Sequence, residues 1–468
     1  MKAKFFSLVF GLIACAGTLL AWDYERVQIG DLYYNLDATN KTAEVADCDY
    51  RGYHKYEMIV NIVHSVSYKN TEYSVKSIGD EAFIECYALT SIVIPNSVIS
   101  IGKDAFAECE NLTSIEIPNS VISIGHGAFA GCESLNKPIY NAHVFAYLPH
   151  SYSGAYSIPN GIKSISNAFS NCKSLTSIEI PNSVTNIGDG AFAHCNALTS
   201  IVIPNSITNI GSFAFEDCTG LTSIEIPNSV TNIGDGAFYD CKNLTSIEIP
   251  NSVISIGVGA FAGCKSLNKP IYNAHIFAYL PHSYSGAYSI PNGIKSISNA
   301  FSNCKSLTSI EIPNSVTNIG DGAFAGCENL TSIEIPNSVI NIGDRTFIDC
   351  ENLTSIEIPN SVTNIGDGAF EGCHRLTSVV IPNSVTSIGY RAFIYCHSLT
   401  SVVIPNSVTS IGADAFRGCK GLTSVTIPNS VTSIGFYAFA DCPSLTTLRV
   451  PEGLERFRFP ASIEIIYY

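Results

Sequence analysis

Hydrophobic residues recur along this chain with a period of 23 residues. One unit, residues 112–133, reads LTSIEIPNSVISIGHGAFAGCE. In its first part Leu112, Ile115 and Ile117 are expected to face inward, and the polar residues between them outward. That alternation predicts a short β-strand.

The rest of the unit predicts a turn, a second strand and a compact loop. Pro118 ends the first strand and Asn119-Ser120 supplies turn residues. Residues 121–124 are expected to form the second strand. The segment from Ala128 to Cys132 is predicted to be one helical turn or a tight loop that places Ala, Phe and Cys in the core.

Close copies of this unit run from about residue 75 to residue 442. One coil cannot bury its own apolar edges, so stability requires that coils stack and share a core. A leading L-x-x-I-x-I within a period of this length is the signature of a leucine-rich repeat. The sequence therefore predicts a β-rich leucine-rich-repeat solenoid over 75–444, with two parallel sheets and short helical or turn segments.

The period breaks at two places, where successive cysteines lie 40 residues apart rather than 23. The additional residues predict short coils near 135–151 and 267–283. In the first of them Leu135–Tyr140 is expected to act as the leading strand and His143–Leu148 as the second strand. The two places are almost identical in sequence, so a block of 132 residues has been duplicated.

The two ends differ from the repeats, as a solenoid with exposed terminal coils requires. Residues 22–74 are predicted to form an amino-terminal β cap, with a hairpin around Asp37–Asn40. Residues 445–468 are charged and irregular, and are expected to form a carboxyl-terminal cap.

The first residues are typical of an export signal. Lys2 and Lys4 precede an apolar run too short to anchor a membrane protein, which predicts a signal peptide over residues 1–21. An alternative is a lipoprotein signal, in which Cys15 would carry lipid. We therefore expect a secreted or cell-surface protein. In the lipoprotein alternative it is an outer-membrane lipoprotein, bound to the membrane only through that lipid.

Composition narrows the class of partner. Apolar residues make up 46% of the chain and charged residues 14%, which favours one long core over disorder. The formal net charge of −15 argues against nucleic acid and anionic membranes and favours cationic partners.

The 17 cysteines mostly occupy one column of the repeat, starting at Cys86 and ending at Cys442. An inward column of this kind predicts free, buried thiols that act as small apolar residues. Disulfides between stacked coils are the alternative, because adjacent strands lie within bonding range. Cys48 lies in the amino-terminal cap, outside the column.

The pattern I-P-x-S-V-T-x-I-G-x-x-A-F-x-x-C-x-x-L-T-x-I, seen from Ile180 to Ile201, resembles the BspA-like leucine-rich-repeat proteins of bacterial cell surfaces and some protozoan parasites. The resemblance covers most of the mature chain. It implies an exported, adhesin-like protein that binds matrix, host cells or other microbes. No carboxyl-terminal sorting segment follows Leu445, so surface retention is expected only if Cys15 is lipidated.

Glutamates recur at the fifth position of the leading strand, which we expect to line the concave face. Three of them lie on successive coils and could bind a basic protein segment or a divalent cation; a solvated ladder kept by repeat duplication is the alternative. The candidates are Glu311, Glu334 and Glu357, together with Glu225 and Glu248. The column changes to Val380, Val403 and Thr426 near the carboxyl end, which predicts a less charged patch.

The two short coils concentrate aromatic residues. Tyr147 and Tyr152, repeated as Tyr279 and Tyr284, are candidates for a glycan or protein contact; core packing is the alternative.

No catalytic, phosphate-binding, dinucleotide or metal motif is present in the sequence. We therefore expect a non-catalytic binding protein without cofactor or metal that recognises an extracellular protein or glycan. The alternative is a structural solenoid with no external ligand.

Overall fold

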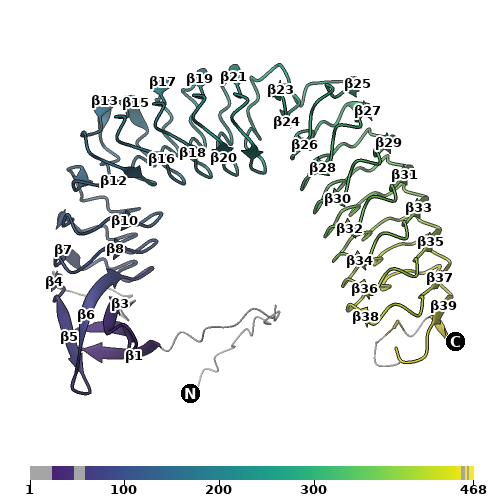
Figure 1. Cartoon of the computed structure of the whole chain (residues 1–468), viewed down its shortest axis with the longest axis horizontal. Helices are drawn as coiled ribbons and strands as arrows, with labels where there is room; N and C mark the ends of the chain where they lie inside the picture. Colours follow the sequence, from purple (N-terminus) through teal and green to yellow (C-terminus); the bar gives the residue numbers. More distant parts are fainter. Residues whose placement is uncertain (1–23, 47–57, 455–458, 461–462) are drawn as a thin grey trace.

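The computed structural model describes residues 24–46, 58–454, 459–460 and 463–468. The predicted signal peptide, Cys15 and Cys48 lie outside the described residues. Stacked coils form one long open arc, with the amino-terminal cap at one end and the carboxyl terminus at the other (Figure 1). The described residues contain no helix.

The leading L-x-x-I-x-I segments form parallel strands along one side of the arc. The outer strands are β4 (Met58–Asn61), β7 (Leu89–Val93), β9 (Ser114–Glu116), β13 (Ser153–Ser157), β15 (Ser174–Glu179), β17 (Ser200–Val202), β19 (Ser223–Glu225), β21 (Ser246–Glu248), β25 (Gly286–Ser289), β27 (Leu307–Glu311), β29 (Ser332–Glu334), β31 (Ser355–Glu357), β33 (Ser378–Val380), β35 (Ser401–Val403), β37 (Ser424–Thr426), β39 (Thr447–Val450) and β40 (Glu464–Tyr467).

The second strand of each coil forms the other parallel side and is shorter than predicted. The inner strands are β6 (Thr71–Ile78), β8 (Ser100–Ile101), β10 (Ser123–Ile124), β12 (Val144–Tyr147), β14 (Ser164–Ile165), β16 (Asn186–Ile187), β18 (Asn209–Ile210), β20 (Asn232–Ile233), β22 (Ser255–Ile256), β24 (Ile276–Tyr279), β26 (Ser296–Ile297), β28 (Asn318–Ile319), β30 (Asn341–Ile342), β32 (Asn364–Ile365), β34 (Ser387–Ile388), β36 (Ser410–Ile411) and β38 (Ser433–Ile434).

The curvature runs opposite to our expectation. The leading strands, with Glu225, Glu248, Glu311, Glu334 and Glu357, lie on the convex side, and the two-residue strands line the concave side (Figure 1). Placing the glutamates on a concave face was therefore wrong. The wider side of each coil becomes the convex side of the arc. In the regular coils the segment opposite the leading strand is a two-residue strand and not a helix, so that side is the narrower one and becomes concave.

The loop that joins inner to outer strands is a hydrogen-bonded ladder and has no helical turn. The amides of Gly368, Phe370 and Gly372 donate to carbonyl oxygens of the next coil at 2.7, 2.8 and 3.0 Å. Two positions of this loop adopt positive φ, at 59° for Gly368 and 72° for Gly372. Left-handed residues at this spacing exclude an α-helical turn, so the tight loop is the form that the structure adopts.

The glycine that ends each inner strand lies directly on the backbone of the preceding coil. A Cβ atom added at Gly366 would come within 2.6 Å of the backbone carbon and oxygen of Gly343. A side chain here would collide with the preceding coil, which explains the Ile-Gly of the units that stack on a regular coil. The two units that follow the corners carry Ser166 and Ser298 instead.

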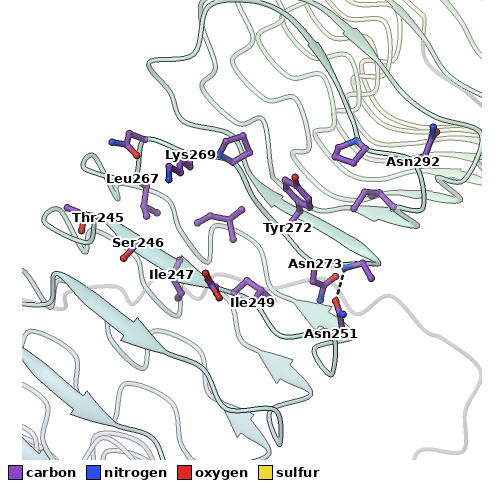
Figure 2. Close-up of a pocket in the computed structure, with 17 residues that line it drawn as sticks. Thr245, Ser246, Ile247, Ile249, Asn251, Leu267, Lys269, Tyr272, Asn273 and Asn292 are labelled. Atoms are coloured by element: carbon purple, nitrogen blue, oxygen red, sulfur yellow. Dashed lines mark hydrogen bonds between the residues drawn. The ribbon is translucent and has the colours of Figure 1, made fainter.

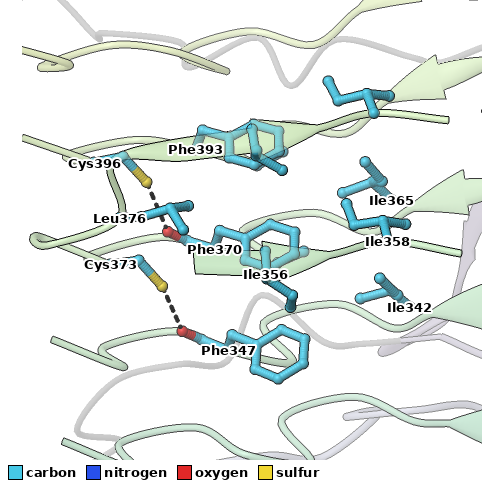
Figure 3. Close-up of a cluster of buried hydrophobic side chains, with 14 of the residues drawn as sticks. Ile342, Phe347, Ile356, Ile358, Ile365, Phe370, Cys373, Leu376, Phe393 and Cys396 are labelled. Carbon is cyan, nitrogen blue, oxygen red and sulfur yellow. Dashed lines mark hydrogen bonds between the residues drawn. The ribbon is translucent and has the colours of Figure 1, made fainter. Parts of the chain in front are cut away.

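A column of stacked phenylalanines runs through the core (Figure 3). Phe347 and Phe370 have ring centroids 5.3 Å apart, and Phe370 and Phe393 5.1 Å apart, with almost parallel planes. All three rings are fully buried. Offset stacking at this distance is favourable, so the aromatic column supports the coil spacing that the backbone ladders set.

The cysteine column lies beside the phenylalanines. The thiol of Cys373 donates to the carbonyl oxygen of Phe347, and that of Cys396 to Phe370, both at 3.2 Å. The fifteen cysteines that the structure describes are all buried and free, which confirms the prediction for this column. The same carbonyl oxygens also accept from the backbone nitrogens of Cys350 and Cys373 at 3.2 Å, so each thiol adds a second hydrogen bond.

The arc bends at two corners, and these coincide with the two period breaks (Figure 1). At each corner a short strand pairs antiparallel with an inner strand: β11 (Ile139–Tyr140) with β12, and β23 (Ile271–Tyr272) with β24. The expectation that Leu135–Tyr140 continues the leading-strand sheet was wrong. A proline and an asparagine flank β11, and likewise β23. They limit each of these strands to two residues, which is too short to join the parallel outer sheet.

The amino-terminal cap has the predicted hairpin. Its strands are β1 (Tyr24–Ile29), β2 (Leu32–Asp37), β3 (Thr42–Val45) and β5 (Ser65–Tyr68). β2 and β3 pair antiparallel, and β3 then pairs parallel with β6, which begins the inner sheet. The carboxyl-terminal segment is more regular than expected, because β39 and β40 extend the outer sheet.

Replacing one ring of the aromatic column should destabilise the solenoid. We expect Phe370→Ala to lower the free energy of unfolding by about 3–5 kcal/mol, because it leaves a cavity between two coils. The matched control is Phe436→Ala, whose ring is 80% exposed and whose loss should change stability by about 0.5 kcal/mol or less. Urea denaturation followed by circular dichroism measures both, and equal effects would contradict the assignment.

The buried thiols should resist alkylation. Burial raises the pKa of Cys373 well above that of a free thiol, and only the thiolate reacts. We expect iodoacetamide at pH 8.5 to leave the described cysteine column unmodified in the native protein and to modify it after denaturation. A Ser401→Cys variant, exposed on β35, is the positive control; rapid native labelling of Cys373 by mass spectrometry would refute burial of the column.

Candidate binding grooves at the corners

The second corner contains a groove of about 840 Å³. It opens on the convex side between β21 and β25, which are not hydrogen-bonded to each other. Residues 245–251 form one wall, residues 267–274 form the floor and Pro291-Asn292 lies at the far side (Figure 2). Bending the stack separates its outer strands, and the insertion only partly fills the resulting wedge.

The groove lining is about half polar and half apolar, and its formal charges cancel. Glu248 and Lys269 are its only charged residues, and both are exposed. Amide and hydroxyl groups supply the other polar contacts, with exposed Asn251, Asn268 and Asn292 among them. A surface of this composition can donate and accept several hydrogen bonds to an uncharged polar ligand.

Tyr272 provides an aromatic face within the groove. Its ring stacks on Phe277, with centroids 5.7 Å apart and planes 7° apart. The side chain nevertheless remains 45% exposed. Core packing therefore fixes the orientation of the ring, and its remaining surface faces the groove (Figure 2).

Buried Asn273 holds the floor of the groove in place. Its amide nitrogen donates to the carbonyl oxygens of Pro250 and Val253 at 3.1 and 2.9 Å. Its amide oxygen accepts from the backbone nitrogens of His275 and Ile276, both at 2.8 Å. This side chain ties the insertion to the preceding coil, and it was not among the residues that the sequence singled out.

The lining of the groove is repeated within the chain. Each of its 17 residues has the same residue type 132 positions earlier. Glu116, Lys137 and Tyr140 are the counterparts of its charged and aromatic residues. Tyr140 is 46% exposed and stacks on Phe145 at 5.5 Å, so the first corner presents its tyrosine in the same way.

Two of the four predicted tyrosines cannot contact a ligand. Tyr147 and Tyr279 are 4% and 5% exposed, and their hydroxyls donate to the carbonyl oxygens of Cys132 and Cys264 at 3.3 and 3.4 Å. Burial raises the pKa of Tyr279 to about 12. Their assignment as ligand contacts was wrong, because β12 and β24 are buried on both faces and do not alternate.

Tyr152 and Tyr284 are half-buried at the corners. Each hydroxyl donates to a nearby carbonyl oxygen, of Ala155 and Ala287 respectively, at 2.7 Å. They pack against the core clusters, so they support the corner loops, and the exposed rings are those of Tyr140 and Tyr272.

The predicted glutamates are exposed on the convex face. Glu248 lines the corner groove, and Glu225 lines an adjoining recess of about 510 Å³ that Glu248 shares. Glu334 and Glu357 lie opposite each other in register on β29 and β31. Glu311 accepts a hydrogen bond from the Ser289 hydroxyl at 2.7 Å.

Among the residues that the structure describes, no three His, Cys, Asp or Glu side chains form a group suited to a metal ion. Within these described residues, the hypothesis that the glutamates of the leading strands bind a divalent cation therefore has no set of metal ligands to support it. No helix in the described ranges could cross a membrane.

The family model described as the BspA type leucine rich repeat region matches residues 76–167, 141–268, 276–400 and 386–461. The chain belongs to this family. As a BspA-type protein it has the fold predicted from its repeat. The first corner insertion falls within the matched residues, and the second spans the gap between residues 268 and 276.

Solved structures with the same repeat cover most of this BspA-type chain. A leucine-rich repeat protein from Bacteroides ovatus is 31% identical, covering 94% of this chain and 99% of its own, with a TM-score of 0.39. A leucine rich cell surface protein from Faecalibacterium prausnitzii is also 31% identical, covering 81% and 94%, with a TM-score of 0.43. No curated protein sequence matches the chain.

The two tyrosines of the second corner should respond differently to truncation. We expect Tyr279→Ala to lower the free energy of unfolding by about 3 kcal/mol, because a buried ring and its hydrogen bond are lost. Tyr272→Ala should cost about 1 kcal/mol or less, since much of its ring is exposed. Thermal and urea melts compare them; a larger loss for Tyr272→Ala would reverse the assigned roles.

Proposed function

We propose that this chain is a non-catalytic, exported cell-surface protein that binds a neutral glycan in its corner grooves. The carrying observation is the second-corner groove, in which an exposed tyrosine ring lies among amide and hydroxyl groups with no net charge. Sugars offer hydroxyls for hydrogen bonds and apolar C–H faces for aromatic rings, so this combination suits an uncharged saccharide.

The duplication supports two equivalent sites on one chain. All 17 lining positions recur in the first corner, and the hydrogen bond from the Ala274 amide to Asn251 at 3.0 Å recurs as that from Ala142 to Asn119, also at 3.0 Å. Two sites on a rigid arc would bind a polymer or a glycan-covered surface with avidity well above that of either site.

The concave face is a weaker candidate for this role. Its strands present serine, asparagine and threonine without an aromatic platform, and their side chains bond one another, as in the 2.7 Å contact from Asn232 to Asn209. The convex corners instead combine depth, an aromatic ring and polar groups with spare hydrogen-bonding capacity.

A glycan array of neutral plant, yeast and mucin-type oligosaccharides tests this function, followed by titration calorimetry with the captured oligosaccharide. We expect two sites per chain. Tyr140→Ala or Tyr272→Ala should each leave about one native site per chain. In the double variant, binding at each site should be weaker than in the native chain by about 2 kcal/mol or more.

Tyr395→Ala is the matched control, because this tyrosine is 41% exposed but lies on a regular coil away from both corners. It should keep two sites. The proposal fails if the double variant binds like the native protein, or if every neutral glycan is ignored while matrix proteins bind. An array that binds nothing external would favour the structural solenoid.

A further inference from the structure

The carboxyl-terminal part of the array consists of two neighbouring blocks of opposite charge. Residues 321–371, the acidic block, contain nine carboxylates and one arginine, a formal charge of −8. Residues 372–440, the basic block, contain four basic residues and one aspartate, a formal charge of +3. The basic block therefore stands out in a chain whose formal charge is −15.

Three separate columns of the repeat lose their acidic residues at the same boundary. The changes are from Glu334 and Glu357 to Val380, Val403 and Thr426 on the outer strands, from Asp344 and Asp367 to Tyr390, Ala413 and Phe436 after the glycine, and from Glu328 and Glu351 to His374, His397 and Lys420 after the cysteine.

Two of these columns lie on the same side of the arc. Both belong to the loop that runs from the inner to the outer strand, which we call the turn side. Neighbours within a column are in contact: the rings of His374 and His397 are stacked with centroids 4.6 Å apart. Lys305 and Glu328 form an ion pair at 2.6 Å in the same column.

Two of the four cations of the basic block have no carboxylate partner of their own, whereas Arg417 pairs with Asp414 and Asp441 at 3.3 and 2.9 Å. Arg375 and Lys420 form no ion pair within the part of the chain that the structure describes, and both are exposed. The guanidinium of Arg391 lies 4.9 Å from the ring centre of Tyr390, and its buried Nε has no hydrogen-bond partner. Apolar surface accompanies them, since Phe436 is 80% exposed.

We propose that the turn side of the carboxyl-terminal array binds a second copy of this chain. The two copies run antiparallel, so that the basic block of each lies against the acidic block of the other. A twofold axis at the block boundary makes both contacts equivalent and closes the assembly as a dimer.

Matched spacing and charge favour a second copy over another partner. Both blocks repeat once per coil, at about 4.8 Å between neighbouring strands, so cations and carboxylates from two copies can pair along several coils. A long anionic polymer would run from the basic block onto the −8 acidic block and be repelled there. Exposed ion pairs contribute little singly, so the dimer is weak and sensitive to salt.

Complementary charge reversal tests the dimer by sedimentation equilibrium of the full chain. Variant A carries Glu328→Lys and Glu351→Lys; variant B carries Arg375→Glu and Lys420→Glu. Each alone should raise the dimer dissociation constant by about tenfold or more, because like charges then oppose each other. Mixing A with B should lower it again by severalfold without reaching the native value. One contact of the mixed dimer is native, and in the other the substituted positions are again opposite in charge, although the block charges there are −4 and −1.

Lys173→Glu with Lys265→Glu is the matched control, because these lysines occupy the same column outside the basic block. It should dimerise like the native chain, as should the Tyr140→Ala, Tyr272→Ala double variant, which separates this result from glycan binding. A native chain that stays monomeric at low salt overturns the proposal. So does a mixture of A and B that associates no better than either variant alone, with circular dichroism showing both folded.

Discussion

Register between successive coils is the constraint on which this structure depends. Outer strands, inner strands and the turn-side loop all donate backbone hydrogen bonds to a neighbouring coil. A residue at one position of the repeat must therefore lie above its equivalent in the coil below. The phenylalanine stack, the cysteine-to-carbonyl bonds and the bare glycine column all follow from that superposition.

The strict repeat explains stability but provides little that could distinguish one ligand from another. Specific chemistry arises where the repeat changes. At the second corner the parallel ring stack is interrupted while the outer strands separate. Phe261 there meets Tyr279 edge-on at 6.5 Å, and parallel stacking resumes between Phe277 and Phe301 at 4.9 Å. At the carboxyl-terminal end the backbone continues unchanged and only the exposed side chains differ.

Much of the fold could be predicted from the sequence, because each repeated position reports the same environment many times. The inward column of Leu112, the buried column of Cys132 and the two strand segments are visible in this way. Curvature could not be predicted, since it depends on small differences in coil width. Tyr147 and Tyr279 were misplaced because the alternation rule fails for a strand buried on both faces. The grooves required knowing that β23 pairs antiparallel with β24.

The duplicated insertion couples two properties that are usually independent. The same residues that turn the arc also form the groove lining, so one added block of 132 residues would bring both a new bend and a new recess. Recombination between near-identical copies would thus alter valency and overall shape together. A protein that gained further blocks of this kind would close from an open arc toward a ring. It could not add grooves along a straight solenoid, because each groove comes with a bend.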